Sequence, residues 1–120
     1  MRRAAIVASV MLALGILAAG LAAYGAERLR FWNLTAETIT ELYLAPPGSG
    51  QWGPNQCLND PDKGVESDER LTITGVEPGR YDVKLVDKKG RACVMPNVEL
   101  MAGKPYAFSI SEKDVLNCKR

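Results

Sequence analysis

The fold is decided by residues 79–90, which read GRYDVKLVDKKG. Tyr81, Val83 and Leu85 alternate with charged side chains, and this period of two residues indicates a strand with one buried face and one face in water. The strand ends at DKKG, where the glycine is suited to the positive φ of a tight turn. The stretch therefore predicts an antiparallel pair of strands, the second of which begins at Arg91.

The same alternation recurs on both sides of this stretch and predicts about six strands, which cover residues 28–32, 39–44, 71–74, 81–85, 91–100 and 106–110. The second strand loses its phase at Thr40 and Glu41, which predicts a β-bulge. Pro96 lacks a ladder donor and so predicts a bulge or an edge in the fifth strand. Ser111, with Asp114 three residues later, is typical of a helix N-cap. We expect an all-β sandwich of six to seven strands with a short C-terminal helix.

Residues 75–85, GVEPGRYDVKL, followed by the turn at 87–90, resemble the PG-x-Y-x-V hairpin of prealbumin-like sandwiches. Carboxypeptidase regulatory-like domains and collagen-adhesin B-type repeats carry such a hairpin. The wider layout of the chain resembles small secreted bacterial β-sandwich proteins of uncharacterised role. The resemblance implies a prealbumin-like or immunoglobulin-like sandwich, and it brings no known active site.

Residues 1–25 have the order of a bacterial secretory signal peptide. Arg2 and Arg3 precede an uncharged apolar run over residues 4–23, and small residues at Ala23 and Gly25 would precede cleavage before residue 26. The prediction is a single domain over residues 26–120 that is periplasmic or secreted. The alternative is a retained anchor, because such a run is long enough to cross a bilayer of about 30 Å as a helix.

Composition limits the chemistry that the chain can perform. It has no histidine, which removes histidine-activated nucleophiles and the commonest zinc sites. Loss of Arg2 and Arg3 with the signal lowers the 15 basic side chains to 13, against 14 acidic ones. A net charge near −1 gives no reason to expect nucleic acid as a partner, and the membrane is expected only if the signal is retained. We expect no enzyme activity, no cofactor and no metal.

Three cysteines, Cys57, Cys93 and Cys118, allow one disulfide. We favour Cys93–Cys118: if Val94 points inward, Cys93 faces outward, where a terminal helix carrying Cys118 could cover it. Closing that loop would stabilise the domain by about 3–4 kcal/mol. The alternative is a redox-active pair, although the chain has no Cys-x-x-Cys motif. Cys57 is then a half-buried small apolar side chain with a free thiol, a thiol bonded to another chain, or a reactive or metal-binding group.

Residues 45–69 form a long irregular loop, and such loops often bind ligands or are mobile. Trp52, with Asn55 and Gln56 after it and Tyr43 before the loop, is a candidate ligand-binding set, because the rings could stack on a ligand while the amides hydrogen-bond to it. The alternative is that Trp52 fills the open end of the sandwich.

Two metal alternatives rest on other side chains. Acidic residues within 59–69 suggest calcium, but an EF-hand register would put Pro61 and Arg70 at ligand positions, so only an irregular site is left. Met95 and Met101 near Cys93 suggest copper, although gap-filling methionine is the ordinary explanation.

The sequence therefore favours a non-enzymatic extracytoplasmic binding module that contacts an unknown protein or small-molecule ligand. The alternatives are a thiol-dependent redox factor or small enzyme that uses Cys57, and a calcium- or copper-binding envelope protein.

Overall fold

The computed structural model describes residues 28–119, so the predicted signal peptide at 1–25 lies outside the described residues. The described elements are β1 (Leu29–Leu34), β2 (Ile39–Ala45), the 3-10 helix η1 (Gln56–Asn59), β3 (Arg70–Ile73), β4 (Gly79–Asp87), β5 (Ala92–Leu100), β6 (Phe108–Ser111) and the helix α2 (Glu112–Val115). Within this range the predicted all-β class, with six strands and a short C-terminal helix, is confirmed.

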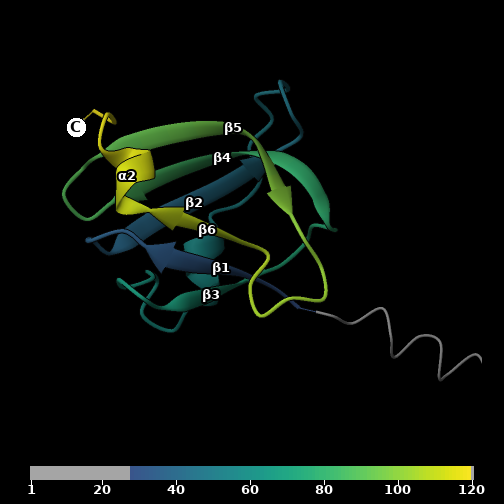
Figure 1. The fold of residues 1–120 in the computed structure, drawn as a ribbon, viewed down its shortest axis with the longest axis horizontal. Helices are drawn as coiled ribbons and strands as arrows, with labels where there is room; N and C mark the ends of the chain where they lie inside the picture. The colour runs from purple at the N-terminus through teal and green to yellow at the C-terminus, as the bar shows by residue number, and fades with distance from the viewer. Residues whose placement is uncertain (1–27, 120) are drawn as a thin grey trace, which may run out of the picture.

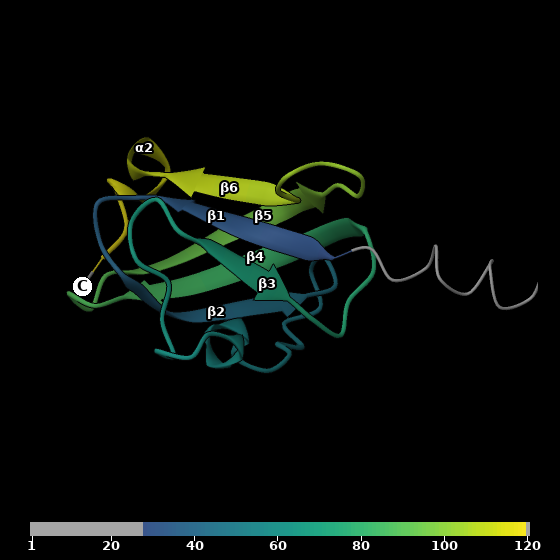
Figure 2. The same ribbon diagram turned by 90° about the horizontal axis from the view of Figure 1, so that it is seen from below.

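The strands form two sheets of three, ordered β3-β1-β6 and β2-β4-β5, which lie against each other as two layers (Figures 1 and 2). Strand β1 pairs antiparallel with β3 and parallel with β6, while β4 pairs antiparallel with both of its neighbours. The β4–β5 pair confirms the antiparallel pairing predicted from residues 79–90.

The core lies between the two sheets and is filled by the inward members of the alternating strands. Phe31, Val83, Leu85 and Ile110 are buried, and the rings of Phe31 and Phe108 have centroids 4.9 Å apart. Each such side chain contributes about 1.5–3 kcal/mol when it leaves water, so this apolar layer is the main source of stability.

Both predicted irregularities are present. The β2–β4 register shifts between Ile39 and Glu41, which confirms the bulge at Thr40. Strand β5 is outermost in its sheet, and its register with β4 shifts between Tyr81 and Val83. Pro96 therefore lies at both an edge and a bulge, where the ladder does not need its missing donor.

The disulfide joins Cys93 to Cys118 as predicted, but the predicted orientation of Cys93 is wrong. Cys93 is buried, whereas Val94 is 58% exposed. The reason is the register: Cys93 lies opposite Leu85, and directly opposed residues share a face of the sheet. Cys118 follows α2 instead of lying on it, and the backbone N–H of Ala92 donates to the carbonyl of Lys119 (2.8 Å).

Candidate ligand-binding site

Asn55 connects the irregular segment 46–69 by hydrogen bonds to β2, an edge strand of its sheet. Its side-chain oxygen accepts from the backbone N–H groups of Leu42 (3.0 Å) and Cys57 (3.0 Å), and its amide nitrogen donates to the carbonyl of Thr40 (3.2 Å). The side chain thus satisfies backbone groups that a neighbouring strand would otherwise pair, and it caps η1.

Gln56 makes the corresponding connection to the other sheet. It is buried; its amide nitrogen donates to the carbonyl of Thr74 (3.0 Å), and its oxygen accepts from the N–H of Thr74 (3.0 Å). Asn59 donates to that same oxygen (2.9 Å) and to the carbonyl of Thr72 (2.9 Å). The amides of Asn55 and Gln56 therefore connect the two sheets through hydrogen bonds within the chain, and a contact of either amide with a ligand stays a prediction.

Tyr43 and Trp52 lie together over the outer face of the β2-β4-β5 sheet. The ammonium of Lys84 lies 5.5 Å from the ring centroid of Tyr43 and 5.4 Å from that of Trp52. The Tyr43 hydroxyl donates to the carboxylate of Glu41, and this hydrogen bond raises the pKa of Tyr43. Trp52 is half-buried outside the core, so it does not fill the end of the sandwich.

A pocket of about 400 Å³ opens where β2 ends and β4 begins. Its walls are mostly apolar and come from the loop after β2, the turn before β4 and the first inward residue of β4. The apolar lining residues are Leu44, Pro46, Pro54, Val76 and Tyr81. The Tyr81 hydroxyl donates to the carbonyl of Glu77 (2.7 Å), which fixes the rim. We call this region the open end.

The sequence did not predict this pocket, because its walls lie where the alternation stops. Val76 stands alone between Gly75 and Glu77, and an isolated apolar residue beyond a strand end is a weak signal in a sequence. Only the crossing of the chain from β3 in one sheet to β4 in the other brings Val76 beside Leu44 and Tyr81.

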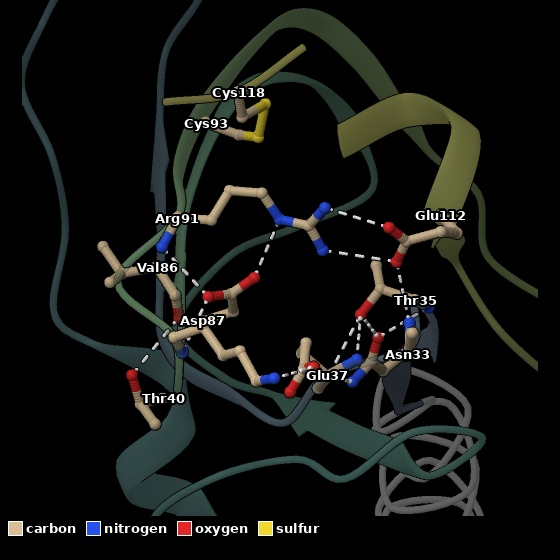
Figure 3. Close-up of polar contacts among 12 residues, drawn as sticks. Asn33, Thr35, Glu37, Thr40, Val86, Asp87, Arg91, Cys93, Glu112 and Cys118 are labelled. Carbon is tan, nitrogen blue, oxygen red and sulfur yellow. Dashed lines mark hydrogen bonds and ion pairs between the residues drawn. A yellow bond between two sulfur atoms is a disulfide. The ribbon is translucent and has the colours of Figure 1, made fainter. Parts of the chain in front are cut away.

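The opposite end of β4 is filled by a polar network, drawn in Figure 3. The Arg91 guanidinium donates to Asp87 (2.9 Å) and, through both terminal nitrogens, to Glu112 (2.9 and 3.2 Å). The same Glu112 carboxylate accepts from the N–H of Ala36 (2.9 Å). The hydrogen bond to Glu112, followed by the one to Asp87, raises the pKa of Arg91, although burial opposes this. We call this region the closed end.

The closed end also contains the buried side chain of Asn33, which is bonded to Thr35, to the carbonyl of Glu37 (2.9 Å) and to the carbonyl of Val65 (3.0 Å). Across residues 28–119 no buried side-chain nitrogen or oxygen lacks a hydrogen-bond partner. The cavity beside Arg91 is about 170 Å³, less than half the volume of the pocket at the open end.

Cys57 is free and fully buried, with its sulfur 3.5 Å from the carbonyl of Ile39. Burial, followed by the nearby carboxylates of Asp60 and Glu41, raises the pKa of Cys57 to about 12. A thiol in this state is a poor nucleophile, and a partner chain has no access to it in the folded domain.

Two carboxylates of the acidic segment 59–69 accept hydrogen bonds from groups of the same chain. Asp60 accepts from the N–H of Asp62 (2.8 Å), and Asp68 accepts from the indole of Trp32 (3.0 Å). Within the described residues no three histidine, cysteine, aspartate or glutamate side chains are grouped to hold a metal ion, and no helix is long and apolar enough to cross a membrane. Comparison with known protein families, curated proteins and solved structures finds no match to this chain.

Proposed function

We propose that this protein is a non-enzymatic, extracytoplasmic binding module whose ligand enters the pocket at the open end. The single observation that carries the proposal is the pocket itself. Its volume of about 400 Å³ lies within the range of small-molecule sites, and its walls have the mostly apolar character of such sites. The walls favour a ligand with an apolar body.

The Cys93–Cys118 disulfide supports the extracytoplasmic part of the proposal. Structural disulfides persist in oxidising compartments and are rare where thiols are kept reduced. Together with the signal-like residues 1–25, it favours a periplasmic or secreted protein.

The burial of Cys57 and its raised pKa favour a binding role over thiol-dependent catalysis. The calcium alternative has no comparable support, because the described acidic side chains are not grouped around a common point. The copper alternative loses the Cys93 thiolate as a ligand, because Cys93 is bonded to Cys118.

The compartment is tested by fractionating the native host and measuring the intact, non-reduced mass after thiol blocking. The proposal expects an envelope or secreted monomer that begins near residue 26, lacks two hydrogens and carries one blocked thiol after denaturation. A cytoplasmic protein with three blocked thiols would refute it.

The ligand site is tested with N-phenyl-1-naphthylamine, a neutral apolar dye whose fluorescence rises in apolar pockets. Val76→Gln places an amide in the pocket wall and is expected to weaken saturable dye binding by about tenfold, because that amide loses water without gaining a partner. Val86→Gln, a matched change on the outward side of β4, should leave dye binding unchanged. Equal binding by both variants would place the dye outside the pocket.

A further inference from the structure

The outer face of the β3-β1-β6 sheet carries a group of arginines around an aromatic pair. Leu29, Phe31 and Asn33 are buried, so the alternate residues Arg30 and Trp32 face outward.

In the neighbouring strand Arg70 lies opposite Trp32, and Thr72 lies opposite Arg30. The register therefore gathers Arg30, Trp32 and Arg70 on one surface, with exposed Arg28 at the start of β1.

The aromatic pair at the centre of this surface is preorganised. The ring of Tyr106 lies 5.1 Å from that of Trp32, centroid to centroid, and the Arg70 guanidinium lies 4.4 Å from the centroid of the Trp32 ring. The Trp32 indole N–H donates to the Asp68 carboxylate (3.0 Å), which fixes the orientation of the ring. Little conformational entropy would be lost if a ligand stacked here.

The charge of the surface is locally positive, although the whole chain is nearly neutral. Arg28, Arg30 and Arg70 are exposed, and the ion pairs found among residues 28–119 all involve other side chains. Asp68 lies at the edge beside the indole. The Glu69 carboxylate turns back to accept from the N–H of Glu66 (2.8 Å). An incoming negative charge would therefore lie toward Arg28 and Arg30, away from Asp68.

A shallow hollow of about 620 Å³ continues this surface along β3 and is lined by Arg28, Asn59, Thr72 and Val76 among others. Its lining is about equally polar and apolar, unlike the pocket at the open end. An extended ligand could thus lie across the aromatic pair and along the arginines.

We propose that this arginine face binds an acidic polysaccharide, a chain of sugar rings that carry carboxylates. Guanidinium groups recognise carboxylates through paired hydrogen bonds. Because the Arg70 guanidinium lies over the Trp32 ring, the apolar faces of sugar rings would pack against the Tyr106 ring and the uncovered part of the indole. A bilayer surface fits less well, because Trp32 is half-buried and bonded to Asp68 instead of projecting from the sheet. The hollow shares Thr74, Gly75 and Val76 with the pocket at the open end, but the arginines and the aromatic pair lie outside that pocket.

The test uses the protein as processed by its host, with Trp52→Phe so that Trp32 is the only tryptophan. Polygalacturonate is titrated at low salt, and uncharged dextran serves as the control polymer. We expect a saturable change in Trp32 emission with polygalacturonate only, weakened at high salt because exposed charges are screened. Arg30→Gln combined with Arg70→Gln should weaken binding about tenfold or more, since each exposed arginine–carboxylate contact contributes a few-fold or more in affinity.

The matched control is Arg80→Gln combined with Lys88→Gln, which removes the same charge from elsewhere on the surface. It should change affinity by no more than about twofold. If Arg70→Gln unfolds the domain in thermal melts, Arg28→Gln combined with Arg30→Gln takes its place. The proposal would be overturned if the two double variants lost affinity equally, if dextran gave an equal response, or if polygalacturonate gave none. Tighter binding of anionic phospholipid vesicles or of single-stranded DNA would also overturn it.

Discussion

The two ends of strand β4 differ in how they are completed, and Figure 1 shows them at opposite sides of the molecule. At the closed end, Asp87 and Arg91 pair with each other and with Glu112, and the disulfide attaches the C-terminal segment nearby. At the open end, Val76 and Tyr81 face a pocket of about 400 Å³. The polar groups of the closed end are hydrogen-bonded within the chain, so of the two ends of β4 the open end is the one that offers a ligand an apolar pocket.

This comparison predicts that changes at the closed end lower stability, while changes at the open end alter binding. The largest loss is expected for the double variant Cys93→Ala and Cys118→Ala. Removing a cross-link over 25 residues should lower the free energy of unfolding by about 3–4 kcal/mol. Urea denaturation measures the change, and the wild type under reducing conditions should show a similar loss. A change below about 1 kcal/mol would mean that the C-terminal segment stays packed on the domain without the disulfide.

Asn55→Ala tests whether the side-chain amide of Asn55 stabilises the loop beside the open end. The variant leaves backbone groups of Leu42, Cys57 and Thr40 without their partner, and should lose about 2–3 kcal/mol of stability. Gln51→Ala, which removes an exposed amide from the same loop, should change stability by less than about 0.5 kcal/mol. If Asn55→Ala and Gln51→Ala were equally stable in thermal and urea unfolding, the structural role of Asn55 would be contradicted.

Arg91→Met removes the cation from the closed end. Asp87 has 2% of its side chain exposed and would keep only its backbone donors, so we expect a loss of about 2 kcal/mol. Arg80→Met breaks the exposed pair with Glu99 and should cost less than about 0.5 kcal/mol. If Arg91→Met and Arg80→Met were equally stable, the ion pairs of the closed end would make no measurable contribution to the free energy of unfolding.

The smallest effect concerns pH. Hydrogen bonds from Arg91 and from the N–H of Ala36 lower the pKa of Glu112 in the folded protein. The ionised form therefore adds stability above the unfolded pKa of about 4.3, and this contribution is lost as pH falls through the lower folded value. Wild type should exceed Glu112→Gln in stability at pH 7, and the gap should narrow toward pH 3. A gap that is constant from pH 7 to pH 3 would exclude this linkage.

Most of the fold could be predicted because alternation is local. Val83 and Leu85 mark β4, and the phase slip at Thr40 marks the bulge in β2. The facing of Cys93 could not be read in the same way, since the bulge at Pro96 breaks the alternation along β5 and only the register with Leu85 settles it.

The candidate site was harder to predict than the fold. Asn55 and Gln56 are residue types that often contact ligands, but their partners Leu42, Thr40 and Thr74 lie 13 to 18 residues away. These partners include strand-edge backbone groups that a sequence does not reveal. Val76 belongs to no strand, so it became part of a pocket wall only through the path of the chain between the sheets.

The most direct test of the binding proposal is an amide chemical-shift map of the ¹⁵N-labelled, processed protein titrated with N-phenyl-1-naphthylamine. We expect saturable shifts that cluster at Leu44, Val76 and Tyr81, while the amide signals of Asp87 and Arg91 do not move. Shifts centred on Asp87 and Arg91, or spread over the surface without saturation, would contradict the assignment of ligand binding to the open end.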